Sequence, residues 1–319
     1  ATREELWDMA LVKYRYKNWY GSQVYTNDII SALYEPGSVM KTITVAAWVD
    51  TWEINKNSMY QDNWFVEIDT FRISNVAEQC KGYHNFSNAL NFSCNVWMIR
   101  IAQKVWKVLM YQYYDEFGFS KLTGIDLQWE VTSKVEPWEK WSQAWLFTRS
   151  YWLWIWVTQL QVAAAYNVIA NGWIYVKPKI IDKIIYPDGR EVVYKTEAQR
   201  RVVKESTSKI VTDMLYDWTV NWVAKNWAVK WYNLAAKSLT AQIAYKWKYE
   251  NWVWSTVWTF AWFSTIEDPK FTIIVKLERI RTSMYGWETS WFIFADVARY
   301  LFDYYKIPKK IEKEEDVKK

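Results

Sequence analysis

The chain has only 8 glycines among 319 residues, and this scarcity limits the tight turns that it can form. At the average abundance of about 7%, a chain of this length would carry roughly 22 glycines. Tryptophan is abundant instead, with 26 residues, and it often follows asparagine or aspartate, where glycine is the usual turn residue. Asn-Trp occurs at Asn18, Asn63, Asn221, Asn226 and Asn251, and Asp-Trp occurs at Asp217.

Two interpretations account for these tryptophans. In the first, many of the codons are UGA, which the source organism reads as glycine and which is translated here as tryptophan. In the second, the protein is unusually aromatic and binds sugars or lipids. We favour UGA recoding, because an aromatic binding surface has no reason to follow Asn and Asp, and because tryptophan is sterically costly in such turns. UGG codons at Trp64, Trp154 and Trp262 would contradict recoding.

The bulk composition excludes several classes of function. The chain can bury a large core, in one big domain or two smaller ones. The net charge of +5 comes from interspersed charges of both signs, so the sequence shows no basic patch typical of nucleic-acid binding. Cys80 and Cys94 allow one disulfide, and with His84 as the only histidine they cannot build a usual zinc site. We therefore expect no metal, no cofactor and no nucleic-acid partner.

The first residues are polar and charged, so no signal peptide is expected there. The longest uncharged run, residues 150–176, is long enough for a membrane span. However, it carries four amide side chains that suit a buried helix better: Gln159, Gln161, Asn167 and Asn171. We expect a soluble domain taken from a longer, anchored protein.

Apolar periodicity and turn residues predict an α+β (mixed α/β) fold, not a regular βαβ succession. Helices are expected at 38–50, 88–108 behind a loop at 91–95, 111–117, 159–169, 198–216 and 292–305. Strands are expected at 11–16, within 174–193 around a turn at 187–189, at 237–245 and at 271–277. Residues 1–305 are expected to fold as one domain, followed by a charged, disordered tail at 306–319.

Ser38 and Lys41 form the motif that carries the most chemical information. A serine hydroxyl needs a base within hydrogen-bonding reach to act as a nucleophile at neutral pH. On a helix Lys41 would stand over Ser38, and both burial and the amide end of the helix would favour a neutral lysine. A second Ser-x-x-Lys, from Ser206 to Lys209, lies in a charged stretch typical of a solvated helix face. The motif alone therefore does not establish catalysis.

Two further motifs follow in order: Ser93-Cys94-Asn95 in a loop, and Lys237-Ser238-Leu239-Thr240 at the start of a strand. Each has a simpler interpretation when taken singly. Ser93 and Asn95 could cap the following helix, Cys94 could be a small filler, and Lys237 could be a charge at a strand edge. Together, their order and spacing resemble the S-x-x-K, S-x-N and K-[ST]-G pattern of the penicillin-binding proteins.

The flanking sequences extend this resemblance over most of the chain. Tyr-Glu-Pro-Gly before Ser38 is similar to the class B proteins of the division or elongation type. Asn95-Val96-Trp97-Met98 is similar to N-V-G-M, and the stretches at 123–130, 152–161 and 260–263 are similar to T-G-I-D-L-P-G-E, G-Q-G-I-x-V-T-x-L-Q and F-A-G-F. In each of these stretches tryptophan falls on a family glycine, which supports recoding.

The resemblance implies a fold and a nucleophile. The fold is that of the penicillin-binding proteins and serine β-lactamases, with a central antiparallel sheet flanked by helices and a mostly helical subdomain. In the roles that it implies, Ser38 is the acylated nucleophile and Lys41 is its base. Ser93 relays a proton between them and the leaving amine.

The resemblance also implies how the substrate is held. Asn95 hydrogen-bonds the amide of the donor peptide. Lys237 orients the substrate carboxylate together with Ser238 and Thr240. The backbone N–H groups of Ser38 and Thr240 form the oxyanion hole.

By resemblance, the chain is a peptidoglycan D,D-transpeptidase that cross-links stem peptides ending in D-Ala-D-Ala and binds β-lactams. The resemblance implies a glycosyltransferase partner, an extracytoplasmic location and a membrane anchor outside this chain. One alternative is a serine D,D-carboxypeptidase or β-lactamase on the same fold. Another is a catalytically impaired scaffold or β-lactam sensor, since Leu239 and Ala236 replace two family glycines around Lys237.

Overall fold

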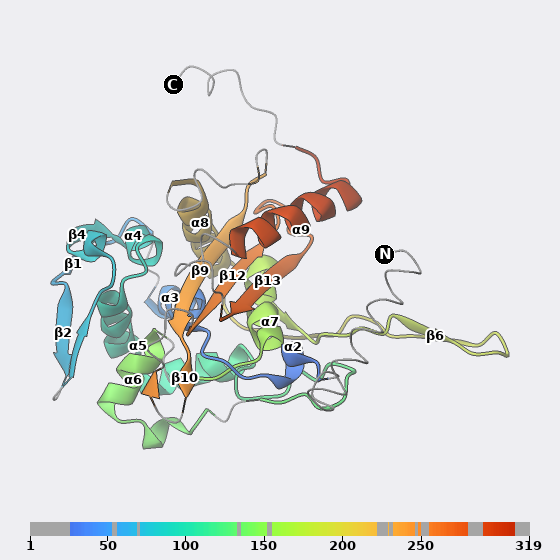
Figure 1. The fold of residues 1–319 in the computed structure, drawn as a ribbon, viewed down its shortest axis with the longest axis horizontal. Helices are drawn as coiled ribbons and strands as arrows, with labels where there is room; N and C mark the ends of the chain where they lie inside the picture. The colour runs from blue at the N-terminus through green and yellow to red at the C-terminus, as the bar shows by residue number, and fades with distance from the viewer. Residues whose placement is uncertain are drawn as a thin grey trace, which may run out of the picture.

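A three-stranded antiparallel sheet lies at the centre of the fold (Figure 1). The computed structural model describes residues 26–52, 56–68, 71–132, 135–151, 155–221, 229, 232–245, 248–249, 255–279 and 290–309. Within these residues the strand order is β13–β12–β9, formed by Thr272–Glu278, Thr256–Phe263 and Ala235–Gln242. The strand predicted at 11–16 and the tail at 310–319 lie outside the described residues. The α+β prediction is confirmed.

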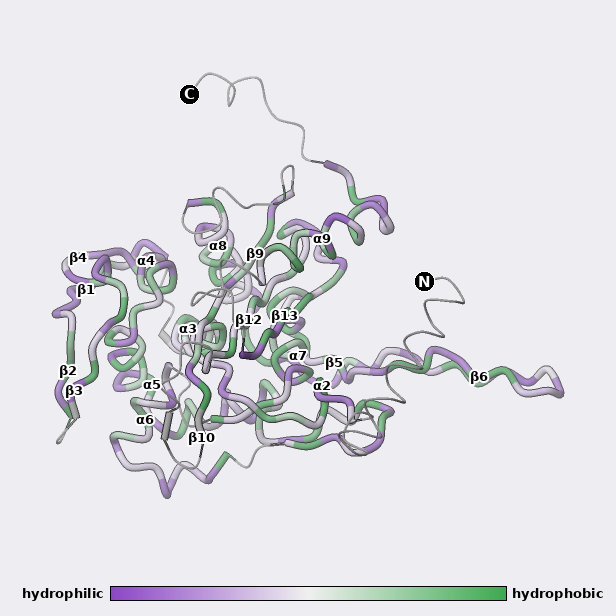
Figure 2. The backbone as a smooth tube through the Cα atoms, viewed as in Figure 1, coloured by the Kyte–Doolittle hydropathy of each residue, from purple (hydrophilic) through white to green (hydrophobic). Residues whose placement is uncertain are grey.

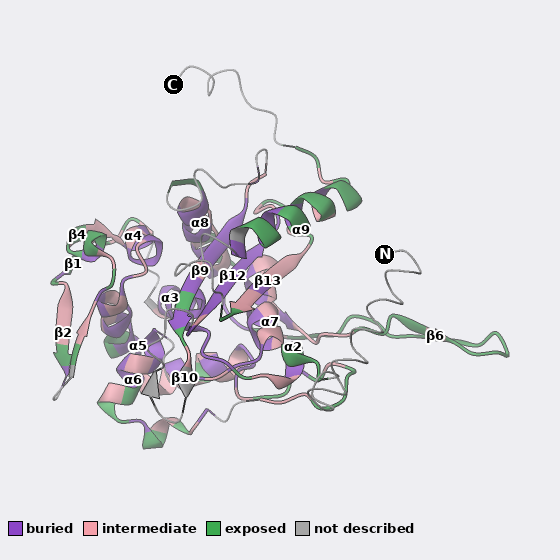
Figure 3. Cartoon of the chain, viewed as in Figure 1, coloured by how far each residue is buried: buried purple, intermediate pink, exposed green. Residues whose placement is uncertain are grey.

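The two faces of the sheet are covered by different helices. Along β12, Ala261 and Phe263 join the core cluster that contains Lys41–Trp52 (α3) and Gln159–Ala170 (α7). Phe260 and Trp262 alternate with them and join a second cluster beneath Ser290–Tyr304 (α9). Figure 2 shows hydrophobic stretches along the sheet and α7, and Figure 3 shows β12 buried while the outer side of α9 is exposed. This is the layered arrangement that the resemblance implied.

A mostly helical part lies beside this layered core. Its helices are Phe86–Asn91 (α4), Asn95–Glu116 (α5) and Gln143–Ser150 (α6), with the short 3-10 turns Glu78–Cys80 (η3) and Trp138–Lys140 (η4). Two antiparallel strand pairs border it: the hairpin of Phe65–Ile68 (β2) with Phe71–Ser74 (β3), and the pair of Met59–Asp62 (β1) with Gly82–Asn85 (β4), which flanks this hairpin in the chain. The helical region predicted at 88–108 covers the end of α4 and the first part of α5, and the helix predicted at 111–117 is the last part of α5; the helical segments of α5 meet at a kink at Trp106, which has a non-helical conformation.

The remaining elements connect these parts. They are the helices Asp28–Ser31 (α2) and Glu205–Asn221 (α8), and the paired strands Ile174–Val176 (β5) with Ala198–Arg201 (β8), Lys183–Ile185 (β6) with Glu191–Val193 (β7), and Ala244–Tyr245 (β10) with Lys248–Tyr249 (β11). The β6–β7 hairpin surrounds the predicted turn at 187–189 and projects from the body (Figure 1). Helix α7 starts with a capping box between Thr158 and Gln161, as expected for a buried helix with a defined start. Among the described helices, none has the length and apolar character to cross a membrane.

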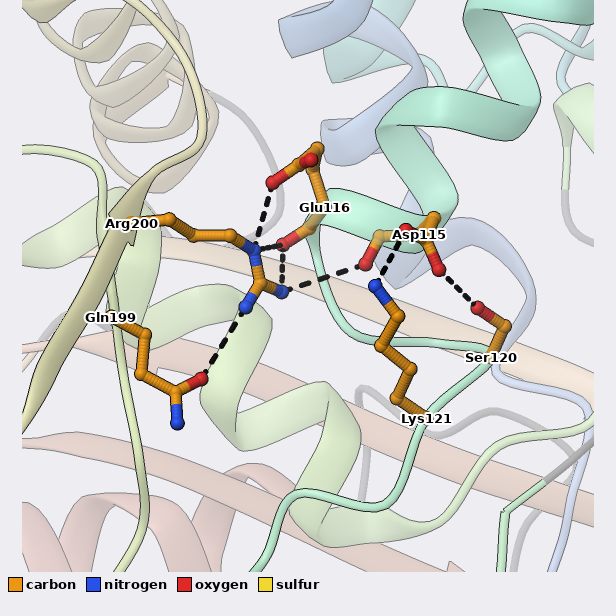
Figure 4. A network of polar contacts seen from close by, with 6 residues as sticks. All are labelled: Asp115, Glu116, Ser120, Lys121, Gln199 and Arg200. Atoms are coloured by element: carbon orange, nitrogen blue, oxygen red, sulfur yellow. Dashed lines mark hydrogen bonds and ion pairs between the residues drawn. The ribbon is translucent and has the colours of Figure 1, made fainter.

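The prediction of one helix over 198–216 is wrong in its first part. Ala198–Arg201 is strand β8, and the helix α8 begins only at Glu205. The extended backbone is held by Arg200, whose guanidinium pairs with the Glu116 carboxylate at 2.8 Å and donates to Glu116 O, at the end of α5 (Figure 4). Asp50 then accepts the N–H of Lys204 at 2.7 Å, which sets the start of α8 from outside the helix.

Several tryptophans occupy backbone conformations that suit glycine. Of the seven non-glycine residues with positive φ in the described part of the chain, four are tryptophans: Trp64, Trp106, Trp129 and Trp173. At Trp106 the φ of 68° and ψ of 156° fall in a region that is essentially restricted to glycine. Five indole nitrogens are also buried without a hydrogen-bond partner, whereas buried Trp N–H groups usually find one: Trp48, Trp97, Trp173, Trp258 and Trp262.

Candidate active site

Ser38 lies in a short 3-10 turn, Gly37–Met40 (η2), which leads directly into α3. The backbone N–H of Lys41 donates to Ser38 O, so the turn and the helix are continuous. A hydrogen bond fixes the turn to α7: the Tyr166 hydroxyl donates to Val39 O at 2.7 Å. The other three residues of the turn are buried, while Ser38 is half-buried. The local fold therefore leaves the serine as the accessible side chain of a fixed turn.

Lys41 is only 1% exposed, and its amine lies among oxygen acceptors. Nζ donates to Ser93 O at 2.6 Å, to Ser93 Oγ at 3.1 Å and to Asn95 Oδ1 at 2.6 Å. Burial, and then the positive charge of Lys237, hold the pKa of Lys41 well below its usual value. A neutral Lys41 can accept a proton, as a general base must. Within the described part of the chain, no hydrogen bond joins Ser38 to the Lys41 amine.

Ser93 and Asn95 reach Lys41 because the loop between α4 and α5 is held in a fixed shape. Ser93 has a φ of 62°, and the next N–H, that of Cys94, bonds back to Ala89 O at 2.9 Å. Cys94 also forms a disulfide with Cys80, so its interpretation as a small filler is wrong. The capping interpretation of Ser93 and Asn95 is wrong too, because Cys94 is the N-cap of α5 and its side chain makes no cap hydrogen bond.

The third motif lies on β9, which runs beside η2. Lys237 is 2% exposed, and burial lowers its pKa to about 7. Its Nζ lies 4.9 Å from the centre of the Trp218 ring. Ser238 and Thr240 alternate with it along the strand and are half-buried and exposed, respectively. The fold therefore gathers Lys41, Ser93, Asn95 and Lys237 around the serine turn, and β9 carries Ser238 and Thr240 past it.

Leu239 shares a face of β9 with Lys237 and packs onto the serine turn. A Cβ on Gly37 would lie 2.5 Å from Leu239 Cδ1, so the leucine fills the space directly over this glycine. Gly37 has a φ of 50°, so both its conformation and this close approach require glycine. The side chain of Leu239 is 7% exposed, and β9 pairs only with β12 among the described strands. The leucine therefore occupies the gap between turn and strand.

The sequence motifs did not reveal Ser74 and Asn75, which hold Asn95 and the start of α5 in place opposite Lys41. Asn95 donates through Nδ2 to Ser74 O at 3.3 Å, and the N–H of Val96 donates to Asn75 Oδ1 at 3.0 Å. A backbone carbonyl has no sequence signal, and Asn75 lies outside the three motifs. Among the described residues, no group of three or more His, Cys, Asp or Glu side chains is placed to hold a metal ion.

Comparison with known proteins decides the family. Residues 6–298 match the model of the penicillin binding protein transpeptidase domain. The chain belongs to the family of penicillin-binding protein transpeptidase domains. The resemblance to this family is thereby confirmed.

Relatives and solved structures agree with this assignment. Stage V sporulation protein D of Bacillus subtilis is 28% identical over 260 residues, which are 80% of this chain and 40% of that protein. Penicillin-binding protein PbpB of Mycolicibacterium smegmatis is 24% identical over 294 residues, 88% of this chain and 45% of that protein. The chain thus spans less than half the length of both relatives. The crystal structure of penicillin-binding protein 3 of Mycobacterium tuberculosis, complexed with aztreonam, has a TM-score of 0.82 at 23% identity, covering 89% of this chain and 66% of that one.

Proposed function

We propose that the chain is the catalytic domain of a serine D,D-transpeptidase that cross-links peptidoglycan stem peptides. The observation that carries this proposal is the buried amine of Lys41, held among the oxygens of Ser93 and Asn95 one helical turn after Ser38. Desolvation and a like charge favour its neutral form, and a neutral amine is what a serine nucleophile needs nearby. Family membership, and the position of β9 at the edge of the sheet among the described strands, point to an extended peptide as the substrate.

The proposed acylation transfers one proton and exchanges one amide for an ester. Ser38 Oγ passes its proton to Lys41 Nζ and attacks the carbonyl carbon of the penultimate D-Ala. The backbone N–H groups of Ser38 and Thr240 would stabilise the oxyanion. When the C–N bond breaks, the proton passes through Ser93 to the nitrogen of the leaving D-Ala.

The acyl-enzyme then reacts with the amine of a second stem peptide. The amine attacks the ester carbonyl, a new amide forms, the bond from the carbonyl carbon to Ser38 Oγ breaks, and the proton lost by the amine passes to Ser38 Oγ. Asn95 would bind the donor peptide's amide. During the preceding acylation, Lys237, with Ser238 and Thr240, would orient the terminal carboxylate of the donor peptide, which then departs with the leaving D-Ala. A β-lactam would acylate the same oxygen by opening its ring.

Leu239 does not remove the case for catalysis. Its side chain lies against Gly37 on one face of β9, whereas the backbone groups that would pair with a substrate strand lie along the edge of the strand. We therefore propose an active enzyme in preference to a scaffold or sensor. Leu239 would narrow the site from the side of the serine turn and so influence which acyl groups Ser38 accepts.

A donor peptide ending in D-Ala-D-Ala, supplied with and without an acceptor amine, tests this proposal. We expect release of D-Ala and formation of a cross-linked product, both abolished by Ser38→Ala and unaffected by Ser206→Ala. Ser206 is the matched control, because it starts the other Ser-x-x-Lys and is exposed on α8. D-Ala release with a hydrolysed product alone would instead identify a carboxypeptidase, and no release of D-Ala would refute the proposal.

We also propose an extracytoplasmic location, with a membrane anchor outside this chain and a glycosyltransferase partner. The Cys80–Cys94 disulfide supports this location, because such bonds persist in oxidising compartments. The full lengths of the relatives leave room for further segments. Protease accessibility of the full protein in intact cells would test the location, and protection from an external protease would contradict it.

The tryptophan anomaly supports a further part of the proposal, that UGA codons encode glycine in the source organism. Trp129 has a φ of 64° and lies at a position where the family pattern has glycine. Trp97 and Trp262 also fall on family glycines, and their indole nitrogens are buried without partners. Reading the gene decides the point, since UGG codons at these positions would contradict recoding.

A further inference from the structure

Two polar side chains that the proposed chemistry does not use are buried behind α5. Asp62 is 1% exposed and Asn75 is 5% exposed. Asp62 Oδ1 accepts the N–H of Trp64 at 2.7 Å and a hydrogen of the Asn75 amide at 3.0 Å. Buried polar groups cost stability unless they are hydrogen-bonded, so this pair needs a structural or functional reason.

Asn75 provides a cap that the first residues of α5 lack. The N-cap residue, Cys94, makes no side-chain cap hydrogen bond, which leaves the first N–H groups of the helix without a local acceptor. Asn75 Oδ1 accepts one of them, the N–H of Val96, at 3.0 Å. The cap therefore comes from a residue 21 positions earlier in the chain.

The capped end of α5 is the end that holds the lysine base. Asn95, the first residue of α5, accepts a hydrogen of the Lys41 amine at 2.6 Å and donates to Ser74 O at 3.3 Å. Ser74, the last residue of β3, and Asn75 are consecutive, so the end of this strand contacts both Asn95 and the next N–H of the helix. A displacement of this segment would move Asn95 relative to Lys41.

We propose that Asp62 and Asn75 are positioning residues for acyl transfer, because their hydrogen-bonded pair fixes the start of α5 and thereby holds Asn95 against Lys41. The inference rests on the proposed function. Asp62 orients the Asn75 amide, the Asn75 oxygen holds the Val96 N–H, and neither side chain touches the substrate. Asp62 sets the direction of the amide, since a carboxylate can only accept and so turns the Asn75 nitrogen toward itself and the oxygen toward α5.

Because Asp62 only accepts and the Asn75 nitrogen only donates, single substitutions can remove their hydrogen bond and a double substitution can form it again in the opposite direction. Asn75→Ala removes the cap, and Asn75→Asp places two carboxylates together with no hydrogen between them. In the double variant Asp62→Asn/Asn75→Asp, the amide at position 62 can donate to the carboxylate at 75. That carboxylate can still accept the Val96 N–H, and the amide oxygen at 62 can still accept the Trp64 N–H. Asp62 Oδ1 accepts both hydrogen bonds and Oδ2 has none, so the exchange divides the two contacts between the oxygen and the nitrogen of the new amide, which a rotation of the side chain at 62 brings into place.

The test measures the second-order rate constant for acylation of Ser38 by a fluorescent penicillin, together with thermal unfolding, on the 319-residue chain. We expect Asn75→Ala and Asn75→Asp each to lower the rate constant about tenfold or more, the change that 1.4 kcal/mol produces. The exchanged double variant should recover to within about threefold of the parent. Asn171→Ala is the matched control, because Asn171 also exchanges hydrogen bonds with a backbone, that of Ile174, at 3.0 and 2.9 Å, at the end of α7. It should lose stability without losing rate.

The inference is overturned if Asn75→Ala acylates at the parental rate, or if the exchanged variant folds and stays as slow as Asn75→Asp. If Asn75→Ala and Asn75→Asp do not fold, the exchanged variant decides alone: a folded protein with the parental rate supports positioning, and a folded but slow one overturns it. A parent that shows no Ser38-dependent labelling would mean that the proposed function itself has failed. A labelled parent with an unaffected Asn75→Ala rejects only the positioning role.

Discussion

Replacing Trp106 by glycine and by alanine should separate backbone strain from side-chain packing. Trp106 lies inside α5 with a φ of 68° and a ψ of 156°, and its side chain is 55% exposed. Trp145 is a suitable control, because it lies in the first turn of α6 and is 44% exposed, and it is not among the residues with positive φ. Glycine and alanine remove nearly the same packing at either site, so their difference reports mainly the backbone.

The difference should have opposite signs at the two sites. At Trp106, a residue with a Cβ is strained by about 1–3 kcal/mol in a conformation that is essentially restricted to glycine. Offset by the greater chain entropy of unfolded glycine, about 0.5–1 kcal/mol, Trp106→Gly should be up to about 2.5 kcal/mol more stable than Trp106→Ala. At Trp145 the strain is absent, so Trp145→Gly should be about 1 kcal/mol less stable than Trp145→Ala.

Urea unfolding followed by circular dichroism gives the four free energies of unfolding. The reasoning requires glycine to be favoured over alanine at Trp106 and disfavoured at Trp145. If alanine is the more stable residue at both sites, the helix is continuous through position 106 and the glycine-like conformation is not present in solution. The argument for recoding would then lose its strongest structural support.

Three further predictions concern the site and its surroundings. Lys237→Met should shift the acid side of the pH–rate profile for Ser38 acylation to higher pH. The reason is that Lys237 lowers the pKa of Lys41, and Lys41 must be unprotonated to act as the base. An acid side that stays at the same pH in stopped-flow measurements would contradict this coupling. Replacing Cys80 and Cys94 by alanine should lower the free energy of unfolding by about 3 kcal/mol, since the disulfide closes a loop over a sequence separation of 14, and only the parent should respond to reductant. Leu239→Gly should cost about 3 kcal/mol or more, because the side chain fills the space over Gly37; equal denaturation midpoints would show that this contact is not formed.

The sequence predicted the buried helices well because their patterns are strong. The apolar residues and the capping box at Thr158 define α7, and the fixed turn before Lys41 defines α3. The central strand β12 was not predicted as a strand, since both of its faces are buried and no alternation remains to mark it. Ala198–Arg201 became a strand because Arg200 is held by the distant end of α5, which no local pattern records.

Only the site residues that belong to the three sequence motifs could be predicted. Ser38, Ser93 and Lys237 were found because their order is distinctive, and the fold brings Ser93 and Lys237 to the lysine that follows Ser38. The disulfide partner of Cys94 and the cap supplied by Asn75 depend on contacts across 14 and 21 residues. Such contacts arise from tertiary packing, so they became visible only in the structure.

The most direct test of the account is to identify the residue that a β-lactam acylates. The chain is incubated with a penicillin, digested and analysed by mass spectrometry, alongside the Ser38→Ala and Ser206→Ala variants. We expect one penicilloyl group on the peptide that contains Ser38, retained in Ser206→Ala and absent from Ser38→Ala. An adduct on another serine, or no adduct on the folded parent, would contradict the assignment of Ser38 as the nucleophile.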